Sequence, residues 1–249
     1  MAKRRFLVLS DIHANQEALE AVLRAVSRRR YEGVLCLGDL VGYGANPDPV
    51  VTRVRRLPRL VTVRGNHDKV VCGLASAENF NVAARRAADW TAARLSRENL
   101  AFLKAMPQGP KNLGDGMWIC HGSMADEDAY LFSDYDAYEA FQHADFEICF
   151  FGHTHFPCAF RQTKAGIEFH PLKGEVAEIV RNPGERLLVN PGSVGQPRDR
   201  NPWASFGEYY PDVGRFVLRR IPYAAERARA KILRAGLPEN LGNRLLVGT

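Results

Sequence analysis

Histidine, aspartate and asparagine side chains gather in five short clusters along this chain of 249 residues. In chain order they are Asp11-x-His13, Gly38-Asp39, Gly65-Asn66-His67-Asp68, His121-Gly122 and Gly152-His153-Thr154-His155. Such side chains bind metal ions and transfer protons. An Asp-x-His or Gly-Asp pair arises often by chance, but a core histidine rarely stands between two polar residues just after a glycine. The five clusters together therefore predict a chemical site.

An apolar run rich in β-branched residues ends at each cluster. These runs cover residues 6–10, 34–37, 60–63, 117–120 and 148–151. Short apolar runs bounded by glycine and polar residues are typical of buried strands. Loops at the carboxyl ends of neighbouring strands converge in an α/β sheet, so we expect the five clusters to meet in space.

Seven of the clustered residues are candidate metal ligands: two carboxylates, one amide and four imidazoles. They are Asp11, His13, Asp39, Asn66, His121, His153 and His155. This set is larger than one tetrahedral structural zinc uses, and it suits two cations about 3.5–4 Å apart with a bridging carboxylate. Imidazole and carboxylate ligands favour transition metals over calcium or magnesium. The expected cofactors are two divalent transition-metal ions, manganese first, with iron, zinc or nickel as alternatives.

The segments between the clusters predict an α/β domain. Helical patterns separate the early strands, and Asn15 is placed to cap the first helix. Residues 79–106 have the spacing of two inserted helices, either a lid beside the site or a core pair. After His155 the pattern becomes strand-rich, which predicts a second sheet packed on the first, and a last helix over residues 224–235 stops at Gly236. No repeat or linker interrupts residues 1–249, so we expect one domain.

Composition restricts the class of protein. Apolar residues make up 46% of the chain, and no apolar run reaches the ~20 residues that span a bilayer. The apolar stretch near the N-terminus is too short for a signal peptide, so we expect a cytoplasmic protein. The net charge of +6 suits a phosphate-bearing substrate without requiring nucleic acid. Five scattered cysteines argue against a disulfide framework and are interpreted as small buried hydrophobic residues.

The order of the clusters resembles that of the calcineurin-like metallophosphoesterase superfamily. Residues 38–44, 88–95 and 190–198 are further similar to a compact bacterial and archaeal branch, whose members are often labelled phosphodiesterases, protein-phosphatase-like or diadenosine-tetraphosphatase-like enzymes. The resemblance covers nearly the whole chain. It implies a four-layer α-β-β-α sandwich of two mixed sheets with a small helical insertion. It also implies hydrolysis of a phosphomonoester, a phosphodiester or a dinucleoside polyphosphate.

The same resemblance implies a role for each cluster. Asp11, His13 and His155 bind one metal, Asn66, His121 and His153 bind the other, and Asp39 bridges the two. A hydroxide between the metals then attacks phosphorus, His67 acts as general acid, and Asp68 orients His67. The large eukaryotic protein phosphatases have Arg after Gly-Asn-His-Glu, whereas Asp68 and Lys69 stand here. This difference argues against a specialised protein phosphatase.

Two alternative functions stay open. A metal-dependent nuclease agrees with the basic charge, but the chain has no basic stripe interleaved with aromatic residues to hold a strand of bases. A non-catalytic binding scaffold is the other, although degenerate members of the superfamily lose ligands that this chain keeps. Ser193 lies outside a G-x-S-x-G motif, so a serine hydrolase is not favoured. We expect a small phosphorylated substrate, with nucleotides among the candidates; the substrate, the native metal and the oligomeric state stay open.

Overall fold

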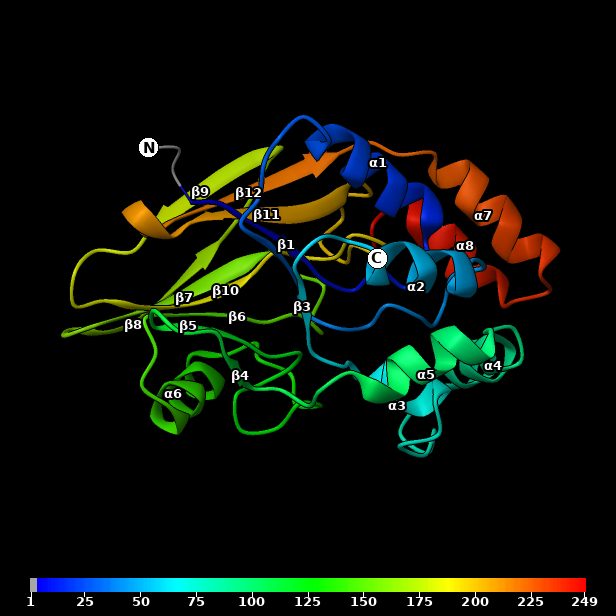
Figure 1. Cartoon of the computed structure of the whole chain (residues 1–249), viewed down its shortest axis with the longest axis horizontal. Coiled ribbons are helices and arrows are strands. Elements are labelled where there is room, and N and C mark those ends of the chain that lie inside the picture. Colours follow the sequence, from blue (N-terminus) through cyan, green and yellow to red (C-terminus); the bar gives the residue numbers. More distant parts are fainter. Residues whose placement is uncertain (1–3) are drawn as a thin grey trace.

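Three parallel strands near the N-terminus begin the first of two sheets in the computed structural model, which describes residues 4–249 (Figure 1). They are β1 (Phe6–Leu9), β2 (Gly33–Cys36) and β3 (Leu60–Thr62). Three antiparallel strands from the C-terminal half extend the sheet: β11 (Ala204–Tyr210), β12 (Arg215–Ile221) and β9 (Val176–Val180). The strand order is β3-β2-β1-β11-β12-β9.

The second sheet is also mixed. Its parallel strands are β5 (Met117–Ile119), β6 (Ile148–Phe150) and β10 (Arg186–Asn190). Its antiparallel strands are β4 (Lys111–Asn112), β7 (Cys158–Thr163) and β8 (Gly166–Pro171). The strand order is β4-β5-β6-β10-β7-β8.

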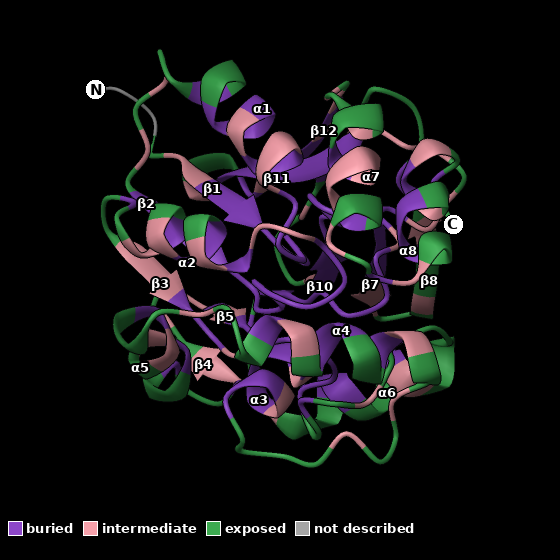
Figure 2. Ribbon diagram, turned by 90° about the vertical axis from the view of Figure 1, so that its right-hand side faces the viewer, coloured by how far each residue is buried: buried purple, intermediate pink, exposed green. Residues whose placement is uncertain are grey.

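Helices cover the outer faces of both sheets and complete the predicted four-layer α/β fold. On the first sheet lie α1 (Gln16–Val26) and α2 (Pro47–Arg55), and on the second lies α6 (Asp134–His143). The C-terminal elements are α7 (Ala225–Arg234), α8 (Glu239–Asn243) and the short 3-10 helix η2 (Arg244–Leu246), while η1 (Pro211–Val213) joins β11 to β12. Figure 2 shows these helices with exposed faces outward and buried faces against the sheets.

Alternate side chains of the strands fill different layers. Val8 of β1 and Phe150 of β6 belong to the apolar core between the sheets. Leu9 of β1 packs instead with the helices α1 and α2, and Cys149 of β6 packs with α6. The strands β1 and β6 therefore bury both faces, which explains why they appear in the sequence as continuous apolar runs.

The division of strands between the sheets differs from the sequence-based prediction. Of the five strands that precede polar clusters, β1, β2 and β3 lie in the first sheet, but β5 and β6 lie in the second. The late strand β12 returns to the first sheet beside β11, which no pattern predicted. All seven residues of β11 are buried, including Glu208, whose carboxylate accepts hydrogen bonds from Arg29 and Tyr31. A buried charge in mid-strand breaks the apolar pattern that identifies strands in a sequence.

The inserted segment forms two helices, as its spacing predicts: α4 (Val82–Ala92) and α5 (Arg97–Ala105). A short preceding helix, α3 (Asn66–Val71), begins inside the third polar cluster, where the sequence suggested a loop. α5 contacts α2 and α3, and Trp90 of α4 donates a hydrogen bond of 3.1 Å to the carbonyl of Ala235 after α7. The insertion is therefore packed on both sides by the rest of the fold.

Two predictions from composition concern the whole chain. None of the helices within residues 4–249 is both long and apolar enough to cross a bilayer. All five cysteines are buried and unpaired, which confirms their interpretation as small core residues.

Candidate metal centre

The polar clusters meet beyond the carboxyl ends of strands from both sheets, where their ligand atoms form two overlapping groups. One atom each from Asp11, His13, Asp39 and His155 lies within 4.8 Å of the others, and the same holds for Asp39, His121 and His153. All six side chains are buried. Asp39 is common to both groups.

Asp39 lies between the two groups. Its Oδ2 atom is 3.6 Å from Nε2 of His13 and 3.5 Å from Nε2 of His121. Oδ1 of Asn66 lies 3.2 Å from Nε2 of the same His121, which adds the seventh candidate ligand to the second group. The structure thus brings all seven predicted ligands together, with Asp39 in the position of a bridge.

Main-chain carbonyls fix the orientation of three imidazoles. Nδ1 of His13, His121 and His155 lies 3.0, 2.7 and 2.6 Å from the carbonyl oxygens of Val41, Leu37 and Gln196. Because a carbonyl only accepts, each Nδ1 carries the hydrogen, and each ring in its neutral form turns an Nε2 lone pair into the cluster. Nε2 atoms of His13 and His155 face each other at 3.0 Å, and buried Nε2 of His153 has no hydrogen-bond partner among residues 4–249. Converging lone pairs fit a cation between them.

Five of these residues have left-handed backbone conformations. The φ angles are 52° at Asp11, 47° at His13, 51° at Asp39, 65° at His153 and 58° at His155. Such conformations are sparsely populated in non-glycine residues and persist where the surrounding fold enforces them, often at functional sites.

The cluster glycines are required by close approach. A Cβ on Gly152 would lie 2.1 Å from Oγ of Ser10, and one on Gly65 would lie 2.1 Å from Oδ1 of Asp39. Neither glycine has a positive φ angle, so close packing and not a left-handed backbone requires glycine at these two positions. A side chain at either position would displace the carboxylates of the cluster.

Residues 5–207 match the family model of the calcineurin-like phosphoesterase superfamily domain. This chain belongs to that superfamily. An uncharacterized protein of Methanocaldococcus jannaschii, MJ0912, is 36% identical over 252 residues that cover 100% of both chains. The crystal structure of a metallophosphoesterase from Sphaerobacter thermophilus is 38% identical, with a TM-score of 0.86, and the match covers 99% of this chain and 100% of that one. PH1004 from Pyrococcus horikoshii OT3 has the same fold, with a TM-score of 0.81 at 17% identity and 98% of each chain covered.

Burial and neighbouring charges determine the protonation of this phosphoesterase-family cluster. Burial raises the pKa of Asp11 to about 7 and holds the pKa values of His13 and His155 well below their ordinary value. Burial also opposes a charge on His121, yet the Asp39 carboxylate raises the pKa of that imidazole to about 10. Divalent cations bind imidazoles in the neutral form, so a cation at His121 would displace a proton.

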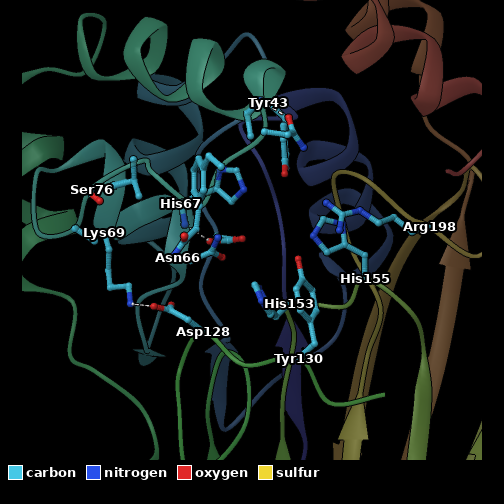
Figure 3. A pocket seen from close by; sticks show the side chains of 17 residues that line it. Tyr43, Asn66, His67, Lys69, Ser76, Asp128, Tyr130, His153, His155 and Arg198 are labelled. Carbon is cyan, nitrogen blue, oxygen red and sulfur yellow. Dashed lines mark hydrogen bonds and ion pairs between the residues drawn. The ribbon is translucent and has the colours of Figure 1, made fainter. Parts of the chain in front are cut away.

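A cavity of about 350 Å³ opens beside the cluster. It is lined by Asp39, Asn66, His67, His153 and His155 of the predicted set (Figure 3). Its other polar and aromatic walls are formed by Tyr43, Lys69, Ser76, Phe80, Asp128, Tyr130 and Arg198. This volume lies within the range of small-molecule sites in proteins.

His67 faces this cavity, but the expected contact with Asp68 is absent from the described residues. Asp68 Oδ1 accepts from the amides of Leu40 and Val41, and its Oδ2 accepts from the amide of Gly65. The carboxylate therefore ties two loops together, and Nδ1 of His67 has no partner. The His67 ring instead packs against the rings of Tyr43 and Phe80, with centroids 4.4 and 4.5 Å away. The structure thus shows both carboxylate oxygens of Asp68 bound to main-chain amides and not to the His67 ring.

Sequence reasoning assigned none of these other wall residues to the site, and three of them lie beside candidate ligands. The ring of Tyr130 stacks on His153 at a centroid distance of 4.0 Å, and Tyr43 and Arg198 line the wall beside His155. Arg198 lies in the 190–198 segment that resembles the family, which was its only signal in the sequence. Tyr130 lies in a loop without periodicity, so no local pattern marks it.

We expect the edge of the insertion, and not its arginines, to affect substrate preference. Phe80 lines the cavity, whereas Arg85 donates to the carbonyl of Ala77, Arg86 donates to that of Gly236, and Arg94 stacks on Trp90. Phe80→Ala should change the ratio of kcat/KM between two esters by roughly tenfold, the upper value of one aromatic contact, with unchanged metal content. Arg85→Gln is the matched control. If both variants leave every kcat/KM unchanged, the insertion is a structural pair and not a lid.

Proposed function

We propose that this chain hydrolyses a phosphate ester with the help of two divalent transition-metal ions, manganese first among them. The observation that carries the proposal is the Asp39 carboxylate shared between two buried Asp/His groups. The superfamily supports a phosphoesterase, and the cavity volume supports a small phosphorylated substrate.

In this proposal Asp11, His13 and His155 would hold one cation, Asn66, His121 and His153 would hold the other, and Asp39 would be shared by both groups. Two such cations lower the pKa of a water toward ~7 and neutralise charge on the phosphoryl group. The chain's own residues supply orientation and a proton. Burial lowers the pKa of His67 to about 4, so the free imidazole is neutral; an anionic phosphate beside it favours the protonated form. His67 then donates that proton to the leaving-group oxygen.

The proposed pair of cations predicts more than one equivalent of metal per chain. Elemental analysis of protein purified without chelator and reconstituted with manganese should approach two equivalents. His153→Ala should lose about one, because His153 belongs to only one of the two groups. The half-buried His170, which belongs to neither group, offers a matched control, and His170→Ala should keep both. A stable value of one or less with full activity would contradict the two-metal site.

An ester panel tests the reaction itself. The manganese-loaded protein is assayed on bis-p-nitrophenyl phosphate, p-nitrophenyl phosphate, cyclic nucleotides, diadenosine tetraphosphate, a phosphopeptide and a single-stranded oligonucleotide. Hydrolysis of a small ester supports the proposal. Cleavage of the oligonucleotide alone would favour the nuclease alternative, and a fully metal-loaded protein that cleaves none of them would favour a binding scaffold.

A further inference from the structure

The guanidinium of Arg198 lies in the cavity wall with almost no partner. Figure 3 shows its side chain beside His155 and turned towards the cavity. Its one side-chain hydrogen bond goes from Nη2 to Oε1 of Gln196 at 3.2 Å, and its buried Nε has none. Among residues 4–249 no aspartate or glutamate forms an ion pair with it, and its guanidinium carbon lies 5.9 Å from the centroid of the Tyr43 ring.

Other partly buried arginines of the fold are paired. Arg220 binds the carboxylate of Asp199, and Arg64 binds that of Glu127 at 2.8 Å. Arg186 has no carboxylate, but it donates to the main-chain carbonyls of residues 141, 144 and 146. A cation removed from water without such partners is costly. Arg198 is therefore unusual among these arginines, because it has few partners and faces a cavity that a ligand can enter.

A second arginine adds positive charge behind the first. Nη1 of Arg244 donates to the same Oε1 of Gln196 at 3.2 Å, and its Nε donates to the carbonyl of Thr249. The main-chain carbonyl of Gln196 accepts from Nδ1 of the candidate ligand His155. Gln196 thus links the two guanidinium groups, through its side chain and its main-chain carbonyl, to the Asp/His cluster.

We propose that Arg198, backed by Arg244 and positioned by Gln196, binds a second phosphate group of the substrate. The inference rests on the proposed phosphoesterase function and narrows its substrate class to compounds with adjacent phosphates, such as nucleoside or dinucleoside polyphosphates. Guanidinium groups match phosphate oxygens in charge and geometry. The cations at the Asp/His groups neutralise the phosphate that reacts, and Arg198 neutralises the next one.

Binding of inorganic pyrophosphate tests the subsite without catalysis. Calorimetric titration uses metal-free protein, because pyrophosphate chelates divalent metals. Arg198→Gln should weaken pyrophosphate binding roughly 10- to 100-fold, as expected for the loss of charge-assisted hydrogen bonds, and Arg198→Lys should restore part of it. Arg86→Gln is the matched control, since Arg86 lies outside the cavity wall and bonds only to the carbonyl of Gly236. Melting temperatures show whether each variant is folded.

Kinetics then distinguish a second phosphate from the reacting one. On diadenosine tetraphosphate, Arg198→Gln should lower kcat/KM by a similar roughly 10- to 100-fold factor, and on p-nitrophenyl phosphate by less than about threefold. An equal loss on both esters would overturn the inference, because Arg198 would then contact the reacting phosphoryl group. A folded variant that binds pyrophosphate like the parent also overturns it. If the parent hydrolyses no ester at all, the proposed function fails, while the pyrophosphate titration still decides the subsite.

Discussion

Replacing Asp39 with asparagine should abolish hydrolysis and weaken metal binding in both groups of ligands. Oδ2 of Asp39 lies 3.6 and 3.5 Å from the Nε2 atoms of His13 and His121, while Oδ1 accepts a hydrogen bond of 2.9 Å from the amide of His67. Asparagine can keep its oxygen on that amide, so the loop stays in place. Its NH2 group then lies between the imidazoles, where it cannot bind a cation.

The expected loss is large in both metal content and rate. Removing an outer-shell partner of a metal ligand already costs ~10–100-fold in affinity, so the loss of a shared ligand should exceed roughly 100-fold at both positions. Metal titration followed by elemental analysis measures this loss. His13→Ala should affect one position more than the other, and Asp145→Asn, at an exposed carboxylate, should affect neither. If Asp39→Asn weakens only one metal, Asp39 is not a bridge.

His67→Asn should lower kcat strongly for esters with poor leaving groups and leave both metals bound. The His67 side chain lines the cavity and packs against the rings of Tyr43 and Phe80. The imidazoles of the candidate metal ligands are instead held by main-chain carbonyls. General-acid help contributes ~10²–10⁴-fold, and it matters most when the leaving oxygen is basic. Alkyl and nucleoside esters should therefore lose most of this factor. p-Nitrophenyl esters, whose leaving group needs little protonation, should lose far less.

Comparison of kcat for the two ester classes in variant and parent decides the role of His67. Phe80→Ala is a useful second variant, because it removes one of the rings that hold the imidazole and leaves the imidazole itself. An equal loss on both ester classes with intact metal would remove His67 from the acid role. Loss of one metal equivalent would make it a ligand instead.

The sequence by itself determined where the site residues lie along the chain. The strands β2 and β6 are buried on both faces and consist of unbroken apolar runs, and the polar ligands begin only after these runs end. Residues 33–36 precede Asp39, and residues 148–150 precede His153 and His155. The helical insertion was also visible, because the 3.6-residue periodicity of helices is a local property. The order of these clusters was enough to indicate the superfamily.

Only the tertiary structure decided how those strands are shared between two sheets and what surrounds the ligands. An apolar run shows that a strand is buried. Which strand lies next to it in the sheet depends on hydrogen bonds to a segment far away in the chain. The same is true of side chains: Asp68 binds the amides of Leu40 and Val41, and Gly152 lies against Ser10. Arg198 reaches the cavity wall because its loop packs beside His155. No carboxylate within residues 4–249 forms an ion pair with it there. Such contacts depend on the folded geometry of distant segments, and no local pattern of residues records them.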